Sequence, residues 1–89
     1  MPAAPIRTVD DIRESWVGDR LVLFHARADK ALVLNPTGAW LWSRIAASPT
    51  AEQLGRDLRG RYPELGDAQA AGDVDAFIAE LRSHGLLAE

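Results

Sequence analysis

The chain has 89 residues, of which 47% are hydrophobic and 26% are charged, and its formal net charge is −3. These values are typical of one soluble globular domain and exclude a disordered chain. The absence of cysteine excludes disulfide frameworks and thiol nucleophiles, and the acidic balance argues against a nucleic-acid ligand held by its phosphates. No apolar run reaches the length of a membrane span and the N-terminus lacks signal-peptide order, so we expect a cytoplasmic protein.

The first part of the chain is predicted to be three short strands. Residues 1–11 begin with a Pro- and Ala-rich stretch and are predicted to be a flexible lead-in to a domain at residues 12–88. Gly18-Asp19 suits a two-residue hairpin turn, since glycine tolerates positive φ. Neither face of the second run is polar, which is compatible with cover on both sides of the sheet. The strand-like runs are IRESWV (12–17), RLVLFH (20–25) and KALVL (30–34).

The rest of the chain is predicted to be three helices. Asn35 can cap the first helix, and Pro36 suits its first turn, where a missing N–H is harmless. The second helix begins at Thr50 with a Thr-x-x-Gln capping-box pattern. The third begins near Asp67, an acceptable N-cap, and Gly85 ends it. Three strands followed by three helices predict an α+β domain. The apolar helix stripes are Gly38, Leu41, Trp42 and Ile45; Leu54, Leu58 and Tyr62; and Val74, Phe77, Ile78 and Leu81.

No group of residues has the pattern of a catalytic or metal site. Asp73 and Asp75 lie two residues apart on a helix and point to different faces, so they cannot share a substrate or a metal. His25 and His84 lack ligand-type spacing. The chain has no Gly-rich phosphate loop, nucleophile elbow or His-x-x-x-His pair. We therefore expect no enzyme activity, no cofactor and no metal.

The predicted meander raises the question of its edges. An edge strand offers unpaired N–H and C=O groups to another chain. The run Lys30–Leu34 carries one charge, at its start, so it is either covered by the protein itself or available to an added strand. Composition favours cover by the protein. A sheet with three helices also describes winged-helix DNA-binding modules, but the acidic third helix argues against DNA binding.

Three segments, in their order and spacing, resemble the family of the pyrroloquinoline quinone biosynthesis protein D (PqqD-like). They are LVLFHARADKALVLNPTGAWLW, PTAEQLGRDLRGRYP and DVDAFIAELRSHGLL. The resemblance spans roughly residues 12–88. It implies a winged helix-turn-helix-like domain, without catalytic activity, that recognises the leader segment of a ribosomally made precursor peptide. The family's closing pattern is matched at Asp73, Val74, Phe77, Leu81, Gly85, Leu86 and Leu87.

The resemblance also implies partners. Free-standing copies of this size with an LNPTGA-like corner look most like the leader-binding protein of lasso-peptide pathways. There the partner is a leader peptidase made as a separate chain, and leaders tend to carry a Tyr-x-x-Pro element. The sibling interpretation is a PqqD-like chaperone for a radical enzyme in cofactor biosynthesis. Neither interpretation implies a nucleic-acid or membrane partner.

Carried onto this sequence, the resemblance implies a binding site between the third strand and the third helix. The leader adds as a strand to Lys30–Leu34, which reverses the preference for a covered edge. Phe77 is expected to touch both core and ligand, whereas simple core packing is the alternative for Val74, Ile78 and Leu81. On the helix, the residues toward the ligand are Asp73, Ala76 and Glu80. The complete implied peptide-binding set is Lys30, Ala31, Leu32, Val33, Leu34, Asp73, Val74, Ala76, Phe77, Glu80 and Leu81.

Overall fold

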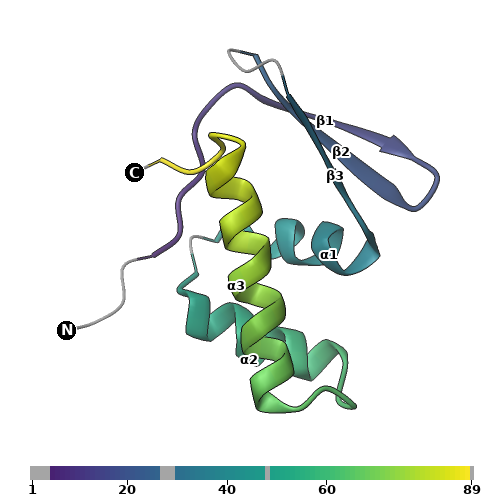
Figure 1. The fold of residues 1–89 in the computed structure, drawn as a ribbon, viewed down its shortest axis with the longest axis vertical. Coiled ribbons are helices and arrows are strands. Elements are labelled where there is room, and N and C mark those ends of the chain that lie inside the picture. The colour runs from purple at the N-terminus through teal and green to yellow at the C-terminus, as the bar shows by residue number, and fades with distance from the viewer. Residues whose placement is uncertain (1–4, 27–29, 48, 89) are drawn as a thin grey trace.

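The protein folds as a three-stranded sheet followed by three helices. The computed structural model describes residues 5–26, 30–47 and 49–88. Figure 1 shows the sheet to one side of α3, with α2 packed along the lower part of that helix. This order confirms the predicted α+β fold and is consistent with a winged helix-turn-helix likeness. The elements are β1 (Ile12–Val17), β2 (Arg20–His25), β3 (Ala31–Leu34), α1 (Pro36–Ile45), α2 (Ala51–Arg61) and α3 (Asp67–Ser83).

The strands form an antiparallel meander in the order β1-β2-β3. Val17 pairs with Arg20 across the predicted two-residue turn, in which Gly18 has a φ of 64°. A glycine with positive φ at this position gives the turn a twist that matches the strands. Leu21 pairs with Leu34 at the other interface, so β3 lies at the edge of the sheet.

Helices cover only one face of the sheet. The core side chains of β2 and β3 are buried leucines, and α1 packs against both strands. On the opposite face Val33 is 53% exposed and Phe24 is 43% exposed. Of the two arrangements that the apolar sequence allowed, the described residues show cover on one side. The buried leucines of the sheet are Leu21, Leu23, Leu32 and Leu34.

Local signals determine where the first two helices begin. The Asn35 side chain accepts a hydrogen bond of 2.8 Å from the Gly38 N–H at the start of α1. At the start of α2 the Thr50 hydroxyl accepts a bond from the Gln53 N–H, and the Gln53 side chain accepts one from the Thr50 N–H. Both predicted caps are confirmed, and each satisfies N–H groups that a helix start leaves unpaired.

The sequence predicted the C-terminal end of α3 correctly but not its N-cap. Asp67 is the first helical residue and not the N-cap; that position belongs to Gly66, which has no side chain to offer. At the other end Gly85 has a φ of 70°, and the Leu86 N–H donates to the Leu81 carbonyl at 2.9 Å. This Schellman arrangement confirms the predicted stop. Leu86 is then buried in the core.

The segment before β1 contacts the end of the chain. The Val9 N–H donates to the Leu86 carbonyl, the Ala88 N–H donates to the Arg7 carbonyl, and Thr8 and Leu87 form an antiparallel bridge. Residues 1–4 of the predicted flexible lead-in lie outside the described residues. The division into 1–11 and 12–88 stays a prediction. Among the described helices, none has the length and apolar character needed to cross a bilayer.

The placement of the core predicts the effect of truncating a sheet side chain. Replacing the fully buried Leu23 by alanine should lower the free energy of unfolding by about 2–5 kcal/mol, because it leaves a cavity under the helices. Val17→Ala is the control, since Val17 is 64% exposed in the neighbouring strand, and should change the value by less than about 0.5 kcal/mol. Urea unfolding followed by circular dichroism measures both. Equal losses in the two variants would contradict this assignment of the core.

Candidate functional site

One edge of β3 has no strand partner in the described part of the chain, because β3 pairs only with β2. In a two-residue hairpin the closing pair, here Val17 and Arg20, exchanges both hydrogen bonds, and such pairs then alternate with non-bonded ones. Leu21 and Leu23 of β2 therefore direct their backbone groups toward β3. The backbone N–H and C=O groups of their partners, Leu34 and Leu32, therefore pair within the sheet.

This alternation leaves the backbone groups of Ala31 and Val33 for the open edge. Both residues are exposed, whereas their neighbours Leu32 and Leu34 are buried. The N–H and C=O groups that face outward thus belong to residues whose side chains do not hold the core together. β3 can accept a further strand without rearranging the sheet.

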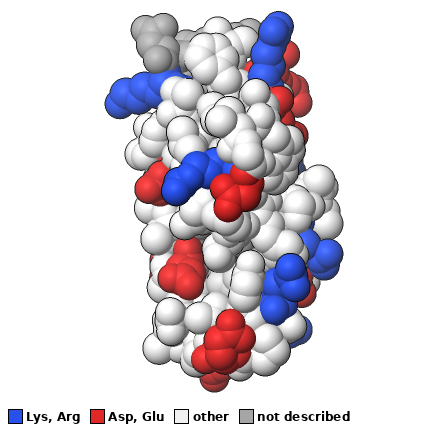
Figure 2. Space-filling model, turned by 90° about the vertical axis from the view of Figure 1, so that its right-hand side faces the viewer, with Lys and Arg blue, Asp and Glu red and all other residues white. Residues whose placement is uncertain are grey.

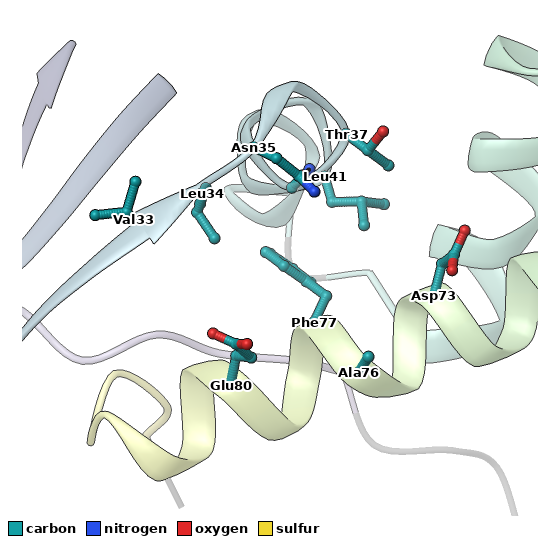
Figure 3. Close-up of a pocket in the computed structure, with 10 residues that line it drawn as sticks. Val33, Leu34, Asn35, Thr37, Leu41, Asp73, Ala76, Phe77 and Glu80 are labelled. Carbon is teal, nitrogen blue, oxygen red and sulfur yellow. Dashed lines mark hydrogen bonds between the residues drawn. The ribbon is translucent and has the colours of Figure 1, made fainter. Parts of the chain in front are cut away.

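A groove runs beside this edge, between β3, α1 and α3 (Figure 3). Its volume is about 280 Å³, which is at or below the lower limit for enclosed small-molecule pockets. Such a shallow site suits individual side chains of an extended segment better than a whole cofactor. The lining residues are Val33, Leu34, Asn35, Thr37, Gly38, Leu41, Asp73, Ala76, Phe77 and Glu80.

The floor of the groove is apolar and belongs to the core. Phe77 points from α3 toward Leu34 and α1 (Figure 3) and is only 6% exposed. Leu41 of α1 is also buried. Phe77 is part of the core and also lines the groove, so its core contact agrees with the expectation that the resemblance implied. Its contact with a ligand stays a prediction.

Polar residues line the sides of the groove. Asp73 and Glu80 project from α3 on either side of Phe77, with Ala76 between them on the same helix (Figure 3). Asn35 and Thr37 line the side formed by the start of α1. The groove therefore combines an apolar floor with acidic groups on one wall and neutral polar groups on the other.

The close corner between β3 and α1 shapes this end of the groove. A Cβ atom on Gly38 would lie 3.3 Å from the Leu34 side chain and 3.3 Å from the Asn35 side-chain oxygen. Glycine is the residue that fits without moving its neighbours. The capping bond from the Gly38 N–H to the Asn35 side chain holds two of these three residues together.

The structure brings most of the predicted site residues together and places others in the core. Val33, Leu34, Asp73, Ala76, Phe77 and Glu80 line the groove. Lys30 and Ala31 are exposed along the same edge. Leu32, Val74 and Leu81 are buried in the core and do not line the groove, and Ile78 is half-buried against that core. Core packing, the alternative for Val74, Ile78 and Leu81, agrees with their burial.

Four lining residues were missing from the predicted set because they come from the corner and from α1. The sequence placed Asn35 and Gly38 at the start of a helix, but only as a cap and as part of an apolar stripe. A signal was available: a helix capped directly after a strand places its first turn beside the end of that strand. The missed residues are Asn35, Thr37, Gly38 and Leu41.

No ionisable cluster accompanies the groove. In residues 5–26, 30–47 and 49–88 no three His, Asp or Glu side chains are close enough to hold a metal ion. No histidine or lysine lines the groove. The arrangement can bind a chain through backbone groups and pockets, and we see no set of residues in it that would transfer a group or a proton.

Comparison with known proteins identifies the same fold in binding proteins. A family model described as coenzyme PQQ synthesis protein D (PqqD) matches residues 20–87. A solved structure of lasso peptide synthetase B1 complexed with the leader peptide has a TM-score of 0.81 and 22% identity, and the match covers 97% of this chain and 100% of that one. TbiB1 in complex with the TbiA(beta) leader peptide has a TM-score of 0.79 and 20% identity, with 91% and 93% covered. No curated protein matches the chain significantly.

The corner predicts a specific effect of changing its cap. Asn35→Ala should lower the free energy of unfolding by about 0.5–2 kcal/mol, because the Gly38 N–H loses its acceptor. Asn35→Asp keeps a side-chain oxygen at the cap and should stay within about 0.5 kcal/mol of the unchanged protein. Thermal and urea unfolding measure both variants. A loss in Asn35→Asp as large as that in Asn35→Ala would show that the capping bond is not what holds the corner.

Proposed function

This chain belongs to the family of coenzyme PQQ synthesis protein D (PqqD), and on that premise we propose that it recognises the leader segment of a ribosomally synthesised precursor peptide. The observation that carries the proposal is the groove beside the unpaired edge of β3. Two proteins of the same fold are known in complex with leader peptides, which supports it. The pathway we propose is lasso-peptide biosynthesis.

Recognition would proceed by strand addition. The leader pairs with the outward N–H and C=O groups of Ala31 and Val33, which gives affinity that depends little on the leader's side chains. Every second leader side chain faces the groove, where Phe77, Leu41 and the α3 carboxylates select among them. Ordering a flexible leader costs part of the interaction free energy. Binding in the micromolar to nanomolar range is therefore the expectation.

We propose that the protein is not itself an enzyme. The groove has no histidine, cysteine or lysine among its lining residues, and a bound leader would need a separate processing enzyme. We propose that this enzyme is a leader peptidase made as a separate chain, to which the domain presents the precursor in the cytoplasm. The family description favours one second candidate, a peptide chaperone for a radical enzyme in cofactor biosynthesis.

Charge distribution argues against a winged-helix DNA-binding role. On the face in Figure 2, Lys and Arg side chains are interspersed with acidic and neutral surface, apart from one small group at the lower right. The formal net charge of −3 also disfavours phosphate contacts. A mobility-shift assay at low salt should show no complex with duplex DNA.

The proposed function predicts saturable binding of a leader. If a precursor peptide is encoded near this gene, its fluorescein-labelled leader should show rising fluorescence anisotropy on titration with the full chain and reach a plateau. The fluorescein-labelled core segment of the same precursor is the control and should not. No saturation by the leader, at concentrations where the protein is folded, would reject leader recognition.

Strand addition makes a sharper prediction at Val33. Val33→Pro removes the outward N–H and should weaken leader binding by about tenfold or more, since one hydrogen bond and the strand geometry are lost. Val33→Ala keeps the N–H and should bind within about threefold of the unchanged protein. Circular dichroism checks that both variants are folded. If the folded Val33→Pro variant binds as well as Val33→Ala, the leader does not pair with this edge.

A further inference from the structure

Among the described residues, no cation pairs with the two carboxylates on the α3 wall of the groove. Asp73 and Glu80 both line the groove, and no Lys or Arg lines it. Among the described residues, neither side chain takes part in a salt bridge or a side-chain hydrogen bond. In the part of the chain that the structure describes, the groove therefore presents two carboxylates without a paired cation. The salt bridges among the described residues lie elsewhere and join Arg44 to Asp57, Arg56 to Glu52 and Arg59 to Asp67.

The spacing of these carboxylates creates a pattern along the groove. Asp73 and Glu80 are seven residues apart, which is about two turns or roughly 10 Å along the helix axis, so they share one face. Ala76 and Phe77 lie between them, each three or four residues from both acids. Figure 3 shows the two acids on either side of Phe77. Along α3 the wall thus reads acidic, apolar, acidic.

An extended peptide that complements this wall has an apolar side chain flanked by basic ones. The apolar side chain fits over Phe77 and Leu41, where the small Ala76 leaves room. Lys and Arg have long apolar stems that can lie along the groove while their charges reach a carboxylate. Resting on the proposed function, we propose that this groove selects leaders in which an apolar residue is flanked by Lys or Arg, and that Asp73 and Glu80 determine this selectivity.

The expected size of the effect follows from the partial exposure of the groove. Each exposed ion pair strengthens binding by only about 1.5- to fivefold, so the two together should amount to about two- to 25-fold. Because salt screens such pairs, the preference should shrink between low and high ionic strength. The backbone pairing to β3 carries no charge and should lack this salt dependence.

A peptide selection tests the inference without knowing the natural leader. An mRNA-displayed library of linear peptides with twelve randomised positions is selected against the full chain and against the Asp73→Asn/Glu80→Gln variant. The matched control, Asp75→Asn/Glu64→Gln, removes the same two charges from exposed positions outside the groove. Both variants change the formal net charge from −3 to −1 (−3 + 2). Anisotropy titrations then compare selected peptides with versions in which Lys or Arg is replaced by Gln.

The outcomes separate this inference from the proposed function. Lys or Arg enriched beside an apolar residue, with the enrichment kept in the control variant and lost in Asp73→Asn/Glu80→Gln, supports the inference. Binders without basic residues would overturn the inference, and so would the same enrichment of Lys or Arg on all three proteins. In either case the proposed leader recognition stands if the Val33→Pro variant fails to bind the selected peptides. No binders to the unchanged protein would count against both.

Discussion

The hydrogen bond from the Gly38 N–H to the Asn35 side chain joins the end of β3 to the first turn of α1, and the geometry of the groove depends on it. The bond works together with the close approach of Gly38 to Leu34, where a larger residue would have to push its neighbours aside. Strand, corner and helix therefore hold one relative position. α3 then needs only to pack its apolar stripe against this unit to complete the groove.

The alternation of β3 separates the backbone groups that hold the sheet together from those at its open edge. Leu32 and Leu34 bury their side chains and use their backbone groups to pair with β2. The side chains of Ala31 and Val33 are exposed, and their backbone groups face the open edge. In a strand of four residues, one pair of residues thus packs the core and pairs with β2, and the other pair keeps its backbone groups available at the open edge. A further strand could pair with this edge while Leu32 and Leu34 keep their pairing to β2 and their buried side chains.

Much of the fold could be predicted because it follows local rules. The glycine turn, the Asn35 and Thr50 caps and the Gly85 stop are each encoded within a few residues. Two kinds of feature could not be read this way. The apolar character of Val22 and Phe24 does not say whether anything covers them, and the contribution of Thr37 and Leu41 to the groove depends on how α1 lies against α3 in space. Composition does not show how elements lie in space, and it favoured a covered β3 edge. The expectation that this edge binds a ligand came from family resemblance.

The pairing of the chain ends has a consequence for tethering. Arg7 to Val9 run antiparallel to Leu86 to Ala88, and in Figure 1 this part of the molecule lies on the side of α3 away from β3. A linker attached next to these paired residues would start on the side of α3 away from the groove. Joining the domain to a processing enzyme by a short flexible linker would then present a bound leader at an effective concentration of about a millimolar, with the recognition surface left open.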